Sequence, residues 1–278
     1  MKISIVSGKG GAGKTTFTVL FANYLINKGV NVLINDLDVE EPNVNLFLNK
    51  KLEYDDVYTY VPRHVKENCT YCKECAEKCL FKALVVAKDF WIVLPELCHS
   101  CKLCEYACKY SAIEGDKRVI GKIGQSVDKV PHLLEGRLNI GESLTTALIK
   151  QVMRKSSNIK DNYDIILMDS PPGTSCPVIE TSKGADKIVV VAEDTPFGFS
   201  DFVVLNDMLK EIGKDYYLII NKFIDGAEYL DFAAKSNVKI LGKIPYDMNL
   251  ARSYSGGHNM GVSIDFDSIY NTLLEGLR

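Results

Sequence analysis

The sequence predicts an α/β fold: a mostly parallel sheet covered by helices on both faces, interrupted by a small inserted domain. Short apolar runs near residues 2–7, 30–35, 163–168, 187–192, 216–221 and 239–244 alternate with stretches of helical period. Strands that alternate with helices in this way form parallel sheets with both faces buried. Eight of the nine cysteines lie within residues 69–108. This clustering predicts a separate small domain, inserted between two parts of the sequence that form the sheet.

The first apolar run leads directly into Gly8-Lys9-Gly10-Gly11-Ala12-Gly13-Lys14-Thr15-Thr16. This segment matches the P-loop pattern G-x4-G-K-T, whose backbone N–H groups form a concave nest for phosphates. We expect Lys14 to reach the outer phosphates of ATP or ADP and Thr15 to bind Mg²⁺. The apolar spacing of residues 17–25 predicts that a helix begins here, with its positive N-terminus toward the phosphates. A glycine-rich structural turn is the alternative, and the succession of strand, motif and helix argues against it.

Four cysteines in the pattern C-x2-C-x2-C-x3-C occur twice, as Cys69, Cys72, Cys75, Cys79 and as Cys98, Cys101, Cys104, Cys108. In this pattern three cysteines of one run and the fourth of the other bind the same [4Fe–4S] cluster. We therefore expect one cluster on Cys69, Cys72, Cys75 and Cys108, and a second on Cys98, Cys101, Cys104 and Cys79. Zinc and disulfides are the alternatives, but zinc sites more often use separated C-x2-C pairs, often with His. The double run resembles a bacterial-type two-cluster ferredoxin.

Lys9 directly follows the first glycine of the loop and is not needed to hold phosphate within one subunit. With this lysine the sequence resembles the deviant Walker A ATPases, the superfamily of MinD, ParA, Mrp and the nitrogenase iron protein. The resemblance implies a homodimer around two nucleotides, in which Lys9 reaches the ATP of the partner subunit. A cation in that place stabilises the charge that develops during phosphoryl transfer.

The resemblance also implies roles for residues that follow the predicted strands. It implies that Asp38 positions the attacking water, that Asp36 supports Mg²⁺ and that Asp169 holds a magnesium-bound water. By the same resemblance Gly173 turns its N–H toward the γ-phosphate, Asn221 hydrogen-bonds adenine, and Pro245 and Asp247 lie in a loop that covers the base. Turns with proline and asparagine at strand ends are also common without any ligand.

Two departures from the family limit what the resemblance implies. Mrp-type cluster scaffolds carry a late C-x-x-C pair, and no cysteine follows Cys176 here. Cys176 lies seven residues after Asp169, where the nitrogenase iron protein has one of its cluster ligands. No cysteine between Cys108 and Cys176 could serve as the second such ligand. We therefore expect Cys176 to be a small buried side chain. The amphipathic stretch from Phe266 to Leu277 has an acidic polar side, so we expect it to pack on the core and not to anchor a membrane.

Composition narrows the remaining possibilities. Lys and Arg number 33 against 36 Asp and Glu, a net charge of −3, so nucleic acid is not indicated as a partner. No apolar stretch approaches the ~20 residues of a membrane span, and cluster cysteines must stay reduced, so we expect a cytoplasmic protein. The expected organisation is an ATPase domain formed by residues 1–59 and 118–278, with the iron–sulfur unit at residues 60–117.

Two functions follow from these motifs. The first is an ATPase whose nucleotide-driven dimer couples ATP to electron transfer, or to metallocofactor maturation, in a redox or metalloprotein partner. The alternative is a MinD/ParA-like spatial organiser or a regulatory ATPase in which the clusters sense redox state. Cluster potentials depend on solvent exposure and on hydrogen bonds to sulfur, so for the first function a closing motion beside the inserted unit has a physical route to altering them.

Overall fold

A computed structural model describes residues 1–128, 130–246 and 264–275. Within these residues the main sheet has nine strands in the order β11-β10-β9-β1-β8-β2-β7-β6-β3. They are β1 (Lys2–Val6), β2 (Val32–Asp36), β3 (Leu52–His64), β6 (Ile113–Ser126), β7 (His132–Leu138), β8 (Ile165–Asp169), β9 (Lys187–Glu193), β10 (Tyr217–Phe223) and β11 (Lys239–Pro245). The seven strands from β11 to β7 pair in parallel, whereas β6 and β3 pair antiparallel at one edge. The predicted mostly parallel α/β sheet is confirmed.

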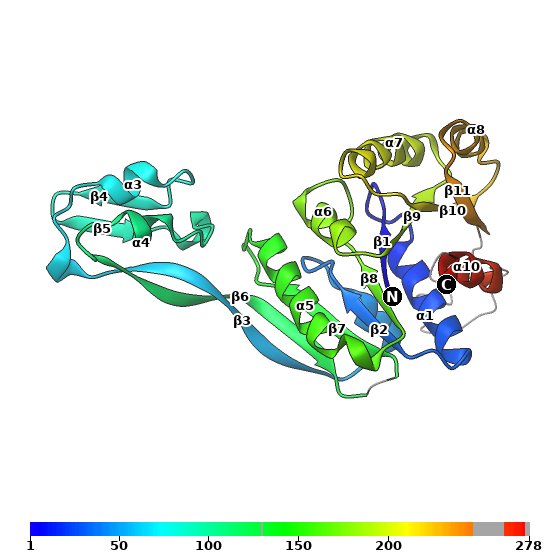
Figure 1. The fold of residues 1–278 in the computed structure, drawn as a ribbon, viewed down its shortest axis with the longest axis horizontal. Coiled ribbons are helices and arrows are strands. Elements are labelled where there is room, and N and C mark those ends of the chain that lie inside the picture. Colours follow the sequence, from blue (N-terminus) through cyan, green and yellow to red (C-terminus); the bar gives the residue numbers. More distant parts are fainter. Residues whose placement is uncertain (129, 247–263, 276–278) are drawn as a thin grey trace.

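Helices cover both faces of the sheet (Figure 1). They are α1 (Lys14–Asn27), α2 (Val44–Leu48), α5 (Thr145–Ile159), α6 (Cys176–Lys183), α7 (Pro196–Glu211), α8 (Ala227–Ser236) and α10 (Phe266–Leu274), with a short 3-10 turn at Lys160–Asn162 after α5. Helices α1, α2 and α10 contribute to one core cluster, and α5 to α8 contribute to the other. Ile269 and Leu273 of α10 are 1 % and 0 % exposed, which confirms that this amphipathic helix packs on the core. None of the described helices combines the length and apolar character needed to cross a bilayer.

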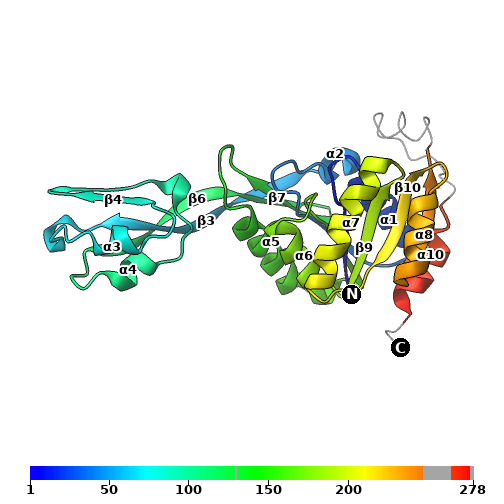
Figure 2. The same ribbon diagram turned by 90° about the horizontal axis from the view of Figure 1, so that it is seen from above.

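Strands β3 and β6 form a long antiparallel ladder that leaves the sheet and projects away from it (Figures 1 and 2). Its register runs from Leu52↔Ser126 to His64↔Ile113. We call residues 52–126 the arm. The predicted boundary residues of the insert, Tyr60 and Lys117, are register partners within this ladder. Strand β3 was not predicted from the sequence, because Asp55-Asp56 interrupts the alternation of apolar and polar side chains within it.

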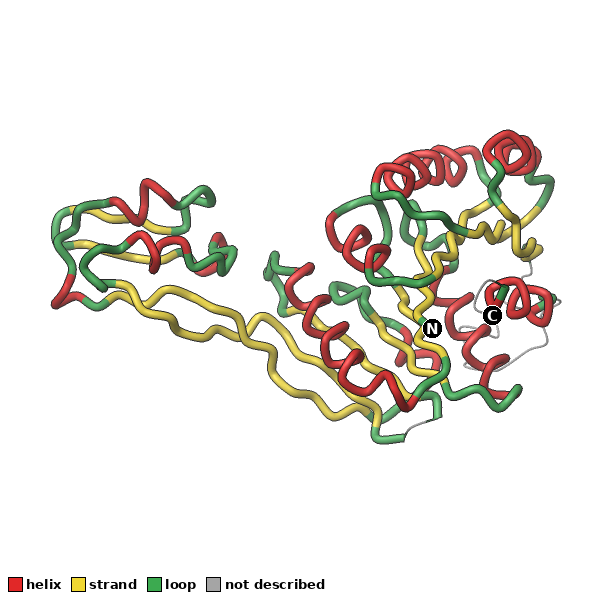
Figure 3. Tube along the Cα trace, viewed as in Figure 1, coloured by secondary structure: helices red, strands yellow, loops and turns green. Residues whose placement is uncertain are grey.

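The far end of the arm, residues 65–112, is a small unit that we call the arm tip (Figure 3). It contains α3 (Glu74–Lys78), α4 (Leu103–Ala107) and the hairpin of β4 (Leu84–Ala87) and β5 (Phe90–Val93), with 3-10 turns at Lys66–Asn68 and Pro95–Leu97. Helices α3 and α4 pack against each other. Each of them lies within one of the two cysteine runs, so their pairing brings the two runs together.

Candidate functional site

The loop between β1 and α1 has a backbone that glycine adopts most easily. Gly11 and Gly13 have φ angles of 74° and 98°, in the left-handed region where a Cβ is crowded by the backbone. Gly8 is required for another reason, because a Cβ there would lie 2.4 Å from the backbone oxygen of Asp201 in α7. Lys14, the first residue of α1, is only 6 % exposed. The other predicted positions of the loop are exposed Gly10, buried Ala12 and half-buried Thr16.

Two fully buried carboxyls lie beside this loop. Asp36 ends β2, Asp169 ends β8, and the two residues are register partners. The Thr15 hydroxyl donates to Asp169 Oδ2 at 2.6 Å, while the N–H groups of Asn43 and Val44 donate to Asp36 Oδ2 at 3.0 and 2.9 Å. Burial raises the pKa of both carboxyls, and the charge of Asp169 raises the pKa of Asp36 further. A divalent cation would offset this cost, and carboxylate and hydroxyl oxygens are ligands that suit Mg²⁺.

Asp38 lies two residues beyond the end of β2, where it is half-buried. Its backbone N–H donates to Asp36 Oδ1 at 3.3 Å. Burial raises the pKa of the Asp38 carboxyl to about 6, although the charge of Lys14 opposes the rise. A carboxyl that titrates close to neutral pH, beside the lysine expected to reach phosphate, is suited to orient a water or accept its proton.

Lys9 forms an ion pair within its own subunit. Its Nζ lies 2.6 Å from Glu193 Oε2, and Lys222 Nζ lies 2.7 Å from Glu193 Oε1. Burial raises the pKa of Glu193, but the hydrogen bonds and charges of the two lysines outweigh this effect and hold that pKa below its usual value. Sequence analysis missed Glu193, whose only signal was its position at the carboxyl end of a predicted strand. In this structure the lysine expected to cross a dimer is paired with Glu193 of its own subunit.

The residues expected at the γ-phosphate and the base contact the protein in this structure. The Asn221 side chain donates to the Ala12 carbonyl oxygen at 2.8 Å, and the Gly173 N–H donates to the Ser7 carbonyl oxygen at 2.9 Å. Both must exchange these bonds to reach a nucleotide. Pro245 ends β11 and is exposed, and Asp247 lies outside the described residues.

The eight cysteines of the arm tip line two cavities. The first, which we call the Cys101 cavity, has a volume of about 210 Å³ and its cysteines are Cys79, Cys98, Cys101 and Cys104. The second, the Cys72 cavity, has a volume of about 20 Å³ and its cysteines are Cys69, Cys72, Cys75 and Cys108. Each cavity thus takes three cysteines from one run and the fourth from the other. This grouping is the one expected from the sequence pattern of two-cluster ferredoxins.

The backbone around the two cysteine runs repeats the same unusual conformation. Three non-glycine residues of each run have positive φ: Tyr71, Lys73 and Lys82 in the first, and Ser100, Lys102 and Ser111 at the matching positions of the second. Such residues cost of order 1 kcal/mol each and persist where the surroundings enforce them. Three backbone N–H groups donate to cysteine sulfur: Tyr71 to Cys69, Ala83 to Cys79 and Ala112 to Cys108. The chain is therefore wrapped around sulfur atoms in both runs.

Among the described residues, no group of three or more His, Cys, Asp or Glu side chains is arranged to hold a metal ion. The two expected clusters therefore stay a prediction from the cysteine pattern. Burial raises the pKa of Cys104 to about 11. It also raises the pKa of Cys98, although the charge of Arg118 opposes that rise.

Cys176 is exposed at the start of α6. The expectation that it would be buried is wrong. The apolar side of α6 is presented by Val178, with Thr181 and Ser182 also buried, and this helix phase leaves the first residue facing solvent.

Residues 3–260 match the family described as CbiA, the CobQ/CobB/MinD/ParA nucleotide binding domain. The chain therefore belongs to this family of nucleotide-binding proteins. It is 32 % identical over 286 residues to the uncharacterized protein MJ0578 of Methanocaldococcus jannaschii, covering 99 % of this chain and 97 % of that protein. The fold and the family together establish a MinD/ParA-type P-loop nucleotide-binding domain.

Solved structures share the fold at low identity. The MinC:MinD cell division protein complex of Aquifex aeolicus aligns with a TM-score of 0.57 and 20 % identity, covering 100 % of this chain and 97 % of that chain. The septum site-determining protein MinD of Pyrococcus horikoshii, complexed with Mg-ADP, aligns with a TM-score of 0.52 and 20 % identity, covering 92 % of this chain and 85 % of that chain.

Proposed function

We propose that this protein is an ATP-hydrolysing switch of the MinD/ParA type that acts as a homodimer and carries two [4Fe–4S] clusters on its arm tip. The family match supports the nucleotide half of this proposal. It also favours the alternative inferred from the sequence, an organising or regulatory ATPase, over electron transfer. The clusters would then sense redox state and set the response of the switch, in the reducing cytoplasm that the cysteines require.

The residues around the phosphate loop can bind Mg-ATP and assist its hydrolysis. The backbone of residues 8–13 would hold the phosphates, and Lys14 would bind their outer oxygens. Thr15, Asp36 and Asp169 would hold the magnesium ion and its waters. Asp38 would orient the attacking water. Lys9 would leave Glu193 and reach the ATP of the partner subunit, so dimer formation replaces one ion pair by another.

The single observation that carries the iron–sulfur half is the grouping of cysteines in the two cavities. Each set supplies the four thiolates that one [4Fe–4S] cluster needs, and the donated N–H groups stabilise the sulfurs. When bound, each cluster would accept and release one electron. Residues 60–117 would form this iron–sulfur unit, with one cluster held by the cysteines of each cavity.

Electron delivery to a protein partner, including one whose metallocofactor is being matured, is the second candidate. It is favoured by exposed apolar side chains beside the Cys101 cavity, where Leu80 is 84 % and Leu103 is 42 % exposed. Apolar surface beside a redox centre allows a partner to approach closely. Oxidation of the reduced clusters by a purified acceptor protein, at a rate that depends on ATP, would favour this candidate over a sensor.

The iron–sulfur half is tested by metal analysis of anaerobically purified protein. We expect about eight iron atoms and eight acid-labile sulfides per chain, the content of two [4Fe–4S] clusters. About two zinc ions per chain and no sulfide would overturn it. Light scattering with Mg-ATP and with Mg-ADP tests the other half, for which we expect a dimer with ATP only.

A further inference from the structure

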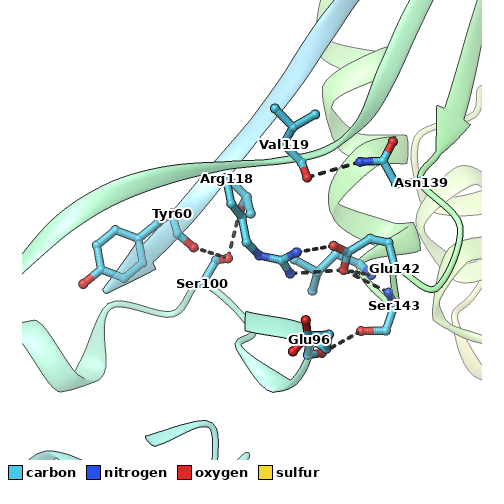
Figure 4. A network of polar contacts seen from close by, with 10 residues as sticks. Tyr60, Glu96, Ser100, Arg118, Val119, Asn139, Glu142 and Ser143 are labelled. Atoms are coloured by element: carbon cyan, nitrogen blue, oxygen red, sulfur yellow. Dashed lines mark hydrogen bonds and ion pairs between the residues drawn. The ribbon is translucent and has the colours of Figure 1, made fainter. Parts of the chain in front are cut away.

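An ion pair between Arg118 and Glu142 lies where the arm tip meets the ATPase domain (Figure 4). We propose that this pair couples the oxidation state of a cluster in the Cys101 cavity to the nucleotide site, an inference that rests on the function proposed above. The guanidinium donates to both carboxylate oxygens of Glu142. The side chains of Arg118 and Glu142 are 17 % and 5 % exposed. A bidentate ion pair that is mostly buried fixes the relative orientation of its two side chains. Removal of either partner leaves the charge of the other one uncompensated.

On the arm side the pair adjoins the loop that carries two of the cavity's cysteines. Arg118 of β6 is the register partner of Thr59 in β3. The Thr59 hydroxyl donates to Ser100 Oγ at 2.9 Å, and the Ser100 hydroxyl donates to the Tyr60 carbonyl oxygen at 2.8 Å. Ser100 stands between Cys98 and Cys101 in the sequence. Ser100 therefore connects the loop of Cys98 and Cys101 to the strand pair that carries Arg118.

On the ATPase side Glu142 fixes the segment that begins α5. Its Oε1 accepts hydrogen bonds from the backbone N–H groups of Ser143 and Leu144, at 2.9 and 3.1 Å. The Ser143 hydroxyl in turn reaches back to the Glu96 carbonyl oxygen of the arm tip at 3.4 Å. Because one carboxylate holds both the guanidinium and these N–H groups, displacement of Arg118 must alter the start of α5.

The start of α5 contacts the loop that carries Asp38. The Thr145 hydroxyl donates to Glu40 Oε1 at 2.7 Å, and the Leu138 N–H donates to the Val39 carbonyl oxygen at 2.8 Å. Asp38 directly precedes Val39 in the chain. The contacts therefore connect the loop of Cys98 and Cys101, through Thr59, Arg118 and Glu142, to the segment that directly follows Asp38.

Charge supplies a reason for the two ends to communicate. Arg118 has one guanidinium to share between Glu142 and a cluster, and its buried Nε–H has no hydrogen-bond partner in the described part of the chain. If a cluster bound in the Cys101 cavity were reduced, as by dithionite in the test below, the added negative charge on the cavity side would attract the guanidinium away from Glu142. The coupling is reciprocal, so a nucleotide that rearranges the Asp38 loop must change the cluster potential by the same free energy.

The test measures the dissociation constant of Mg-ATP for anaerobic, cluster-loaded protein in the oxidised and dithionite-reduced states. We expect the two constants of wild type to differ at least about fivefold, the lower range of allosteric coupling. In Arg118→Gln and in Glu142→Gln the two constants should agree within about twofold. The amide oxygen of Glu142→Gln can still accept from Ser143 and Leu144, so this variant removes the charge and keeps the helix start. Iron content and the thermal unfolding midpoint show that each variant is loaded and folded.

Arg63→Gln is the matched control. Arg63 pairs with Glu114 across the same β3–β6 ladder, but both side chains are more than half exposed. This variant should keep the redox dependence of wild type. Redox-dependent ATP binding that survives in both Arg118→Gln and Glu142→Gln would overturn the coupling role of the pair while leaving the sensor function standing. Equal constants in wild type would instead refute the sensor function, and with it this inference.

Discussion

At the scale of single residues, three carboxyls lie beside the phosphate loop, and burial makes their ionised form unfavourable. Asp36 and Asp169 are fully buried, Asp38 is half-buried, and burial raises the pKa of all three. Functional sites often hold groups in such strained electrostatic environments, because binding of a cation then releases the strain. The unliganded protein should therefore become more stable when one of these charges is removed.

We predict that Asp38→Asn stabilises the nucleotide-free protein at pH 7. The folded pKa of about 6 lies above the unfolded value of 3.8, so between these values the folded state binds more protons and stability falls as pH rises. Wild type carries the full cost at pH 7. Urea unfolding should show a gain of order 1–3 kcal/mol for the variant at pH 7, which vanishes near pH 4.

ATP turnover of Asp38→Asn provides the companion measurement. Without a carboxylate to orient water, hydrolysis should fall by at least about a hundredfold while ATP-dependent dimerisation persists. A variant less stable than wild type at pH 7 would show that Asp38 makes a stabilising contact that outweighs the cost of its burial.

A second prediction separates the two lysines that pair with Glu193. Lys9→Ala should bind Mg-ATP as a monomer within about threefold of wild type and should fail to dimerise, because the cation that crosses to the partner is lost. Lys222→Ala removes the other ion pair of Glu193 and should still dimerise. Sedimentation in the presence of ATP measures both. Normal dimerisation and turnover of Lys9→Ala would contradict the assignment of Lys9.

At the scale of elements, the pairing of α3 with α4 decides which cysteines share a cavity. Cys79 follows α3 and Cys108 follows α4, so each lies at the end of its own helix and lines the cavity of the other run. The sequence pattern predicted this crossed grouping. It could not predict the conformation of Ser100 or Lys102, since serine and lysine rarely adopt positive φ without external constraint.

The crossed grouping predicts which cluster a single substitution removes. Cys79→Ala should damage the cluster held by Cys98, Cys101 and Cys104 and spare the cluster held by Cys69, Cys72 and Cys75. Cys108→Ala is the reciprocal control and should do the reverse. Electron paramagnetic resonance of the reduced protein, combined with iron content near four atoms per chain, distinguishes the two. Loss of the cluster of its own run in either variant would contradict the crossed grouping.

At the scale of the whole molecule, the arm tip lies at the far end of the β3–β6 ladder (Figure 1). The Ser143 hydroxyl also donates to the Glu96 carbonyl oxygen of the arm tip. His64 and Ile113 are register partners at the end of that ladder. Replacement of residues 65–112 by Asn-Gly should therefore close the ladder as a two-residue hairpin. The two core clusters of the sheet contain no residue of the arm tip, so the shortened chain should keep a cooperative unfolding transition.

This shortened chain should bind Mg-ATP within about tenfold of wild type and contain no iron. Calorimetry and metal analysis measure the two properties. Loss of the folded ATPase would contradict the expectation that the arm tip is an independent unit, and retained iron would place the clusters elsewhere in the chain.

The sequence by itself determined the nucleotide-binding loop of this protein and most of its sheet. Local patterns are sufficient for this purpose, because strands buried on both faces are continuous apolar runs and phosphate loops need glycine at fixed spacings. The match of residues 3–260 to a nucleotide-binding family confirms the predicted nucleotide-binding domain. The cysteine spacing also predicted two groups of four cysteines, and the same groups line the two cavities of the arm tip, while the binding of clusters by them stays a prediction.

Only the tertiary structure decided the contacts between distant segments. Nothing local to Arg118 or Glu142 indicates that they pair, since arginine and glutamate on exposed strands or turns look alike in any sequence. The partner of Lys9 was likewise set by the position of β9 beside β1, which brings Glu193 to the phosphate loop. Ion pairs between segments far apart in the chain depend on the register of the sheet, and register depends on how all strands pack together.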